Sequence, residues 1–82
     1  MAKNRIVKNI AEELFGVYGF RYKQLNFYTY RLYKEEDKKH RFFDWYHTTG
    51  SLVSTISGRH NSLKKFSDPE DVCLYIIKKF FT

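Results

Sequence analysis

The side chains that usually perform catalysis or bind metals are few in this chain of 82 residues, and they are widely spaced. Its three histidines, His40, His47 and His60, lack the spacing of a metal site, and the single cysteine excludes a cysteine-based zinc cage. Asp44 is the only acidic residue between positions 38 and 67. A pair of catalytic carboxylates would therefore need an acid from a distant segment.

The only thiol, Cys73, lies within the apolar face predicted for the last helix, where a cysteine acts as a small core hydrophobe. The sequence contains no phosphate-binding loop and no Gly-x-Ser-x-Gly motif. We therefore expect a protein that is not an enzyme and that needs no metal and no cofactor.

Basic and aromatic residues are the more informative feature. The chain has 15 Lys and Arg against 9 Asp and Glu, a net charge of +6, and 20% of its residues are aromatic. Residues 1–34 carry seven cations and two acids, a net charge of +5, and residues 48–66 carry three cations and no acid. Positive charge concentrated in part of a small domain is expected for a protein that binds a polyanion.

These observations predict a set of nucleic-acid-binding residues. The side chains expected to contact phosphates are the cations and the imidazole of Arg21, Lys23, Arg59, His60, Lys64 and Lys65. Side chains near the bases would be Arg31, Tyr33 and Tyr46, because aromatic rings and guanidinium planes stack on unpaired bases.

Apolar periodicity and turn signals predict the elements that position these residues. A helix is expected from Lys3 to about Tyr18, with an apolar stripe formed by Ile6, Val7, Ile10, Ala11, Leu14 and Val17. Strands are expected at residues 26–33, 41–47 and 52–57, followed by a loop at residues 58–62. A second helix begins after Ser67 or Asp68, with Pro69 in its first turn.

The predicted fold is a single α+β domain over residues 1–82, in the order α-β-β-β-α. It is a two-layer structure in which two helices cover one face of a three-stranded antiparallel sheet. The charged run 35–39 is expected to form a solvated turn. Gly50 is expected to supply a positive φ in the tight turn Thr48–Ser51.

Strand alternation divides the aromatic residues between the two faces of this sheet. Expected toward the helices are Tyr28, Tyr30, Leu32, Phe43 and Trp45. Expected on the open face are Phe27, Arg31, Tyr33, Phe42, Asp44 and Tyr46. We expect Arg31 and Asp44 to pair across neighbouring strands.

The order of elements is similar to that of the double-stranded RNA-binding domain, a family that binds the duplex partly through a lysine-rich start of its second helix. Here that helix begins Asp68-Pro69-Glu70-Asp71, whose charge would repel phosphate, so the function is not carried over through that site. A second resemblance lies in Phe43-Asp44-Trp45-Tyr46-His47-Thr48-Thr49-Gly50-Ser51-Leu52-Val53. This segment resembles the Asp-aromatic-aromatic-x-Thr-Thr-Gly hairpin of small uncharacterised phage and virus proteins, which implies an origin in a mobile element.

Three classes of function remain. The first is a small basic protein that binds nucleic acid, without a distinction between DNA and RNA. The second is a protein-interaction module, such as a viral inhibitor or antagonist of a host defence protein, that uses the open sheet face. The third is a homodimer joined through its sheets. No apolar run has the ~18–20 residues of a membrane span, and we expect a cytoplasmic protein, in the host cell if it is viral.

Overall fold

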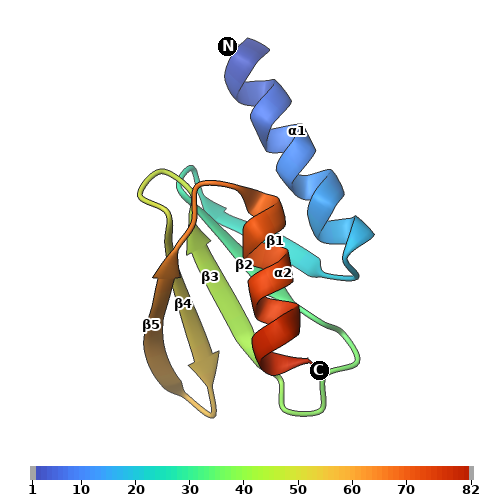
Figure 1. Ribbon diagram of the computed structural model, residues 1–82, viewed down its shortest axis with the longest axis vertical. Coiled ribbons are helices and arrows are strands. Elements are labelled where there is room, and N and C mark those ends of the chain that lie inside the picture. Colours follow the sequence, from blue (N-terminus) through green and yellow to red (C-terminus); the bar gives the residue numbers. More distant parts are fainter. Residues whose placement is uncertain (1, 82) are drawn as a thin grey trace.

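The computed structural model describes residues 2–81, and the side chains of residues 10–81. The elements are α1 (Ala2–Val17), β1 (Arg21–Asn26), β2 (Thr29–Tyr33), β3 (Phe42–Tyr46), β4 (Ser51–Ile56), β5 (Arg59–Lys65) and α2 (Pro69–Phe80). The five strands form one antiparallel sheet in sequence order, and both helices lie against the same face of it (Figure 1). The α+β class and the two-layer arrangement are confirmed.

The predicted number of strands is wrong, because the sheet has five strands and not three. The segment predicted as the first strand is a hairpin, in which β1 and β2 meet at a turn formed by Phe27 and Tyr28. The Asn26 side chain accepts a hydrogen bond from the Tyr28 N–H at 2.8 Å and so stabilises this turn. Phe27 and Tyr28 are therefore exposed at the hairpin tip, not divided between the two faces of the sheet as predicted.

The segment predicted as the loop 58–62 is the other source of disagreement. Gly58 belongs to a tight turn, and residues 59–65 form the edge strand β5, which pairs with β4. Every residue of β1 and six of the seven residues of β5 are exposed. Polar edge strands of this kind are common, since charged side chains on an edge oppose pairing with another chain.

The C-terminal end of α1 and the start of α2 have the capping residues that the sequence predicts. Gly19 has φ +82°, and the N–H of Phe20 donates to the carbonyl of Phe15 at 2.8 Å, which closes a Schellman motif after α1. Asp68 is the N-cap of α2, where its carboxylate accepts from the Glu70 N–H at 2.9 Å.

The core lies between the helices and the central strands. Phe15 of α1 is fully buried, with ring centroids 5.3 Å from Tyr30 and 6.4 Å from Trp45. The ring centroid of Phe80 on α2 lies 4.9 Å from that of Phe43 on β3. Burying these aromatic rings and their neighbours supplies most of the apolar stabilisation, since each ring removes about 150–250 Å² from water. The burial predicted for Tyr30, Leu32, Phe43 and Trp45 is confirmed.

The predicted apolar stripe of α1 is only partly correct. Ala11 is buried in the core, but Ile10 is 49% exposed and Val17 is 70% exposed. Phe15, which was not part of the predicted stripe, lies in the core beside Ala11. The side chains of Ile6 and Val7 lie outside the described residues. Figure 1 shows α1 extending well beyond the sheet, so only the part of its surface near its C-terminal end packs on the strands.

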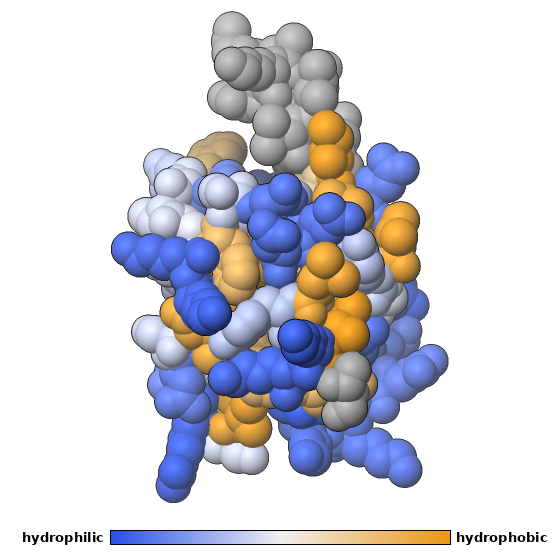
Figure 2. Space-filling view, in the orientation of Figure 1, coloured by the Kyte–Doolittle hydropathy of each residue, from blue (hydrophilic) through white to orange (hydrophobic). Residues whose placement is uncertain are grey.

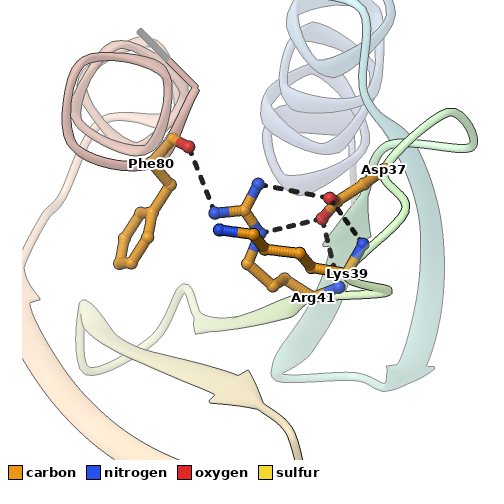
Figure 3. A network of polar contacts seen from close by, with 4 residues as sticks. All are labelled: Asp37, Lys39, Arg41 and Phe80. Atoms are coloured by element: carbon orange, nitrogen blue, oxygen red, sulfur yellow. Dashed lines mark hydrogen bonds and ion pairs between the residues drawn. The ribbon is translucent and has the colours of Figure 1, made fainter.

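The run 35–39 is not the fully solvated turn that was predicted. Its central residue, Asp37, forms an ion pair with Arg41, and the two side chains are only 4% and 11% exposed. Arg41 also donates to the carbonyl of Phe80 at 3.1 Å, so this loop is fastened to the end of α2 (Figure 3).

Within the described part of the chain, neither helix combines the length and the apolar composition needed to cross a bilayer.

Candidate nucleic-acid interface

The face of the sheet opposite the helices is open, and strand pairing shows which residues belong to it. Lys23 lies opposite Arg31, Arg31 opposite Asp44, and Asp44 opposite Val53. Directly paired residues point to the same side of a sheet. Tyr22, the neighbour of Lys23, contacts Phe15 on the helix side, which assigns Lys23 and this whole row to the open face.

Register places seven of the nine predicted nucleic-acid-binding residues on this open face. These seven are Arg21, Lys23, Arg31, Tyr33, Tyr46, His60 and Lys65. The other two, Arg59 and Lys64, are not assigned to it. Arg59 lies opposite Ile56, at a helix-side position, and Lys64 falls in the irregularity where β5 has one residue more than β4. The structure thus brings together predicted side chains from four of the five strands, β1, β2, β3 and β5.

The centre of the open face is formed by the predicted pair of Arg31 and Asp44, which the structure confirms. The guanidinium donates two hydrogen bonds, from Nε to Oδ1 at 2.9 Å and from its terminal nitrogen to Oδ2 at 3.2 Å. The same guanidinium lies 5.0 Å from the centre of the Phe42 ring. The hydrogen bond with Asp44 raises the pKa of Arg31, so the guanidinium keeps its charge, which the ion pair with Asp44 offsets.

This pairing changes the role expected of Arg31. Its charge is already neutralised by Asp44, so it is poorly suited to attract phosphate. Its planar guanidinium, held between Asp44 and the Phe42 ring, is instead a rigid surface on which a base can stack.

Uncompensated positive charge lies on the two edge strands. Lys23 on β1 and Lys65 on β5 form no ion pair among the described residues. Arg21 on β1 contacts Glu35 at 2.6 Å, but both side chains are more than 60% exposed, so solvent weakens the attraction. His60 on β5 shares a hydrogen bond of 2.8 Å with Thr55.

The open face therefore has a consistent layout. Its cations lie along both edges, and its rings, those of Tyr33, Phe42 and Tyr46, lie on the central strands β2 and β3. Tyr46 is the most exposed of these three, at 39%. Sequence reasoning identified the residue types, but the pairing of β1 and β5 onto the central strands was needed to arrange them.

Of the residues considered for catalysis, Asp44 and His60 lie on this face, whereas Cys73, His40 and His47 do not. Cys73 is completely buried, and burial raises the pKa of its thiol to about 12, so the thiol is protonated at neutral pH. His40 lies in the loop 34–41 and His47 in the turn 47–50. Among the residues that the structure describes, no three His, Cys, Asp or Glu side chains are grouped as metal ligands.

The helix side of the molecule has a different surface. Figure 2 shows apolar groups over α1 and α2 interspersed with hydrophilic side chains. Exposed aliphatic residues there are Ile10, Val17 and Leu74.

Comparisons with known proteins add no family to this geometry, because no family model, curated protein or solved structure matches the chain significantly.

Proposed function

We propose that the protein binds single-stranded nucleic acid across the open face of its sheet. The observation that supports this most directly is the layout of that face, in which rings on β2 and β3 lie between cations on β1 and β5. Bases can stack on the rings while the phosphates approach the cations, and this combination is typical of proteins that bind single strands.

A single strand is favoured over a duplex by the position of the rings. Tyr33 and Phe42 are only partly exposed and lie in the sheet surface, where only an unpaired base can reach their faces. The second helix offers no phosphate contact of the kind that duplex binders use, because it begins with Asp68, Glu70 and Asp71.

The direct test is a titration of labelled 12-residue oligonucleotides, single-stranded and duplex, DNA and RNA, followed by fluorescence anisotropy at several salt concentrations. We expect single strands to bind more tightly, with an affinity that falls steeply as salt rises. Tyr46→Ala should weaken binding about 5- to 150-fold, which corresponds to the loss of one stacking contact of about 1–3 kcal/mol.

Two matched controls separate the open face from general surface effects. Tyr28→Ala removes an even more exposed tyrosine, but one at the hairpin tip, so it should leave the affinity unchanged. Lys23→Ala should lower the slope of log affinity against log salt by about 0.7, while Lys38→Ala, in the loop 34–41, should not. No binding at ~50 mM salt, equal losses for Tyr28→Ala and Tyr46→Ala, or a clear preference for duplex would each contradict the proposal.

A protein-binding role is the second candidate, and the specific observation in its favour is the exposed aliphatic group on the helices. Val17 is 70% exposed and Leu74 is 47% exposed, and exposed apolar groups often mark interfaces. Affinity capture from nuclease-treated lysate distinguishes the two candidates. A partner retained by Tyr46→Ala but lost with Leu74→Asp would support protein binding through the helices.

A further inference from the structure

A hollow of ≈ 300 Å³ lies where the turn between β3 and β4 meets the segment that joins β5 to α2. Its size is at the lower end of the range for ligand pockets. The polar residues that line it are His47, Thr48, Thr49, Lys65 and Ser67. This set contains three hydroxyl groups, one ammonium group and one imidazole, and no carboxylate. Such a set of hydrogen-bond donors suits the oxygens of a phosphate group.

The walls of the hollow are fastened to each other by backbone contacts. The Phe66 N–H donates to the Gly50 carbonyl at 2.8 Å, and the Trp45 indole N–H donates to the Phe66 carbonyl at 3.0 Å. Gly50 has φ +85°, and a Cβ added there would lie 2.8 Å from the Phe66 carbonyl oxygen. The two segments can approach this closely only because residue 50 is glycine, so the hollow is preformed.

Several of its polar groups have no other partner. Thr49 is already engaged, since its hydroxyl donates to the Tyr46 carbonyl and accepts from the Ser51 N–H. His47 is engaged as well, because its Nε2 shares a hydrogen bond of 2.8 Å with the Phe27 carbonyl. In contrast, the hydroxyls of Thr48 and Ser67 and the Lys65 ammonium form no hydrogen bond or ion pair within the described residues. They are therefore available to a ligand.

The nearest acidic residue does not oppose an anion from within the hollow. Asp68 follows Ser67 directly, but its carboxylate accepts the Glu70 N–H as the cap of α2 and does not line the hollow. The carboxylate of Glu70 accepts from the Tyr18 hydroxyl at 2.9 Å. Lys65 is thus the only residue among Lys, Arg, Asp and Glu that lines the hollow.

One residue, Lys65, belongs both to the lining of the hollow and, by its register, to the open face. Lys65 lies opposite Ser51 on β4, and Ser51 lies opposite Tyr46 on β3. One cross-strand row therefore links the most exposed ring of the open face to the ammonium group of the hollow. A strand whose base stacks on Tyr46 can bring a phosphate toward Lys65.

We propose that this hollow binds a phosphate group. The identity of the molecule that carries the phosphate rests on the proposed function, in which it belongs to a strand lying on the open face. The phosphate can be a terminal monoester or an internal diester, and both offer the same oxygens to Thr48, Lys65 and Ser67.

The first experiment tests phosphate binding alone. The protein labelled with ¹⁵N is titrated with sodium phosphate, and with sodium chloride at matched ionic strength, while amide chemical shifts are recorded. We expect saturable shifts at Thr48, Gly50 and Ser67 that chloride does not produce. Lys65→Gln should weaken phosphate binding about tenfold, as expected for a charged hydrogen-bond partner. Lys38→Gln, in the loop 34–41, is the matched control and should bind phosphate normally.

Non-saturating shifts spread over many surface lysines, or unchanged binding by Lys65→Gln, would overturn the proposal. Thr48→Val keeps the shape and removes one hydroxyl, so it gives an independent readout if Lys65→Gln folds poorly. In that case, weaker phosphate binding by Thr48→Val supports the hollow as the site, and unchanged binding by Thr48→Val refutes it.

The second experiment identifies the source of the phosphate. Anisotropy titrations compare 12-residue single strands with a 5′-phosphate, a 3′-phosphate or no terminal phosphate. A terminal site predicts that one phosphorylated strand binds more tightly and that Lys65→Gln removes the difference. An internal site predicts equal affinities that Lys65→Gln lowers together. Saturable phosphate binding without binding of any strand would refute the proposed function but not the phosphate site, and strand binding without phosphate shifts would refute only the site.

Discussion

The ion pair between Asp37 and Arg41 offers the sharpest test of how this small fold is stabilised. Oδ2 of Asp37 accepts from Nε of Arg41 at 2.9 Å and from its backbone N–H at 3.2 Å. Oδ1 accepts from the Arg41 guanidinium at 3.2 Å and from the Lys39 N–H at 3.1 Å. Arg41 itself reaches the Phe80 carbonyl and lies 4.5 Å from the Phe81 ring centre. The pair therefore connects the loop 34–41 to the end of α2 (Figure 3).

The size of the effect follows from the pKa of Asp37. Hydrogen bonds from the Arg41 side chain are the main reason that this pKa falls from 3.8 to about 2. A carboxyl with a lower pKa in the folded state contributes stability above its unfolded pKa and loses it as pH falls toward the folded value. The contribution at neutral pH is about 2 kcal/mol, and it disappears between about pH 4 and pH 2.

Asp37→Asn should lower the free energy of unfolding at neutral pH by more than this contribution of the ionised carboxylate. The substitution removes the charge and turns one acceptor oxygen into an N–H₂ group that faces the donors of Arg41 or Lys39. We expect a loss of about 3 kcal/mol in the free energy of unfolding, a large share of the ~5–15 kcal/mol typical of a small domain.

Urea denaturation followed by the fluorescence of the single, buried Trp45 measures this loss at pH 7, 4 and 2. The difference between wild type and Asp37→Asn should be nearly constant from pH 7 to pH 4 and should shrink toward pH 2. Glu36→Gln, an exposed neighbour, is the control and should change stability by less than about 0.5 kcal/mol. A stability loss of less than about 0.5 kcal/mol for Asp37→Asn would refute the stabilising role of the ion pair. A stability difference between wild type and Asp37→Asn that stays constant down to pH 2 would refute it as well.

Two further predictions concern the backbone and the core. Gly50→Ala and Gly58→Ala both place a side chain at positive φ, but a Cβ meets the Phe66 carbonyl at 2.8 Å only at position 50 and meets nothing within 4 Å at position 58. Thermal unfolding should show that Gly58→Ala lowers the free energy of unfolding by about 1 kcal/mol and that Gly50→Ala lowers it clearly more. Equal losses would contradict the close approach of residue 50 to the Phe66 carbonyl. Cys73 should not react with a thiol reagent at pH 8 in the folded protein, because burial raises its pKa to about 12. It should react at the rate of unfolding, and fast labelling without denaturant would show that the thiol is accessible.

The parts of the fold that the sequence predicts correctly have local signals. Asp68 followed by Pro69 sets the start of α2, and Gly19 sets the end of α1, because capping depends on a few neighbouring residues. The central strands carry alternating large apolar residues, so β3 and β4 and the pairing of Arg31 with Asp44 could be predicted from periodicity.

The edge strands could not be predicted in this way. The sequence of β1, from Arg21 to Asn26, and that of β5, from Arg59 to Lys65, contain mostly polar residues without apolar alternation. They are strands because β2 and β4 offer unpaired backbone groups beside them, and such long-range pairing has no local signal. The turn at Phe27 and Tyr28 was missed for a related reason, since aromatic residues rarely form turns.

The same distinction applies to the candidate site. The residue types of the sequence determined the basic and aromatic character of the protein, the two helices with their ends and the central strands. Tertiary structure alone decided that Lys23 and Lys65 lie on opposite edges of one face, and that Lys65 approaches Thr48 and Ser67 across a hollow. It also decided that Asp37 is buried against Arg41 rather than solvated. The physical reason is that side-chain chemistry and turn preferences act over a few residues, whereas strand register and helix packing join residues that are far apart in the chain.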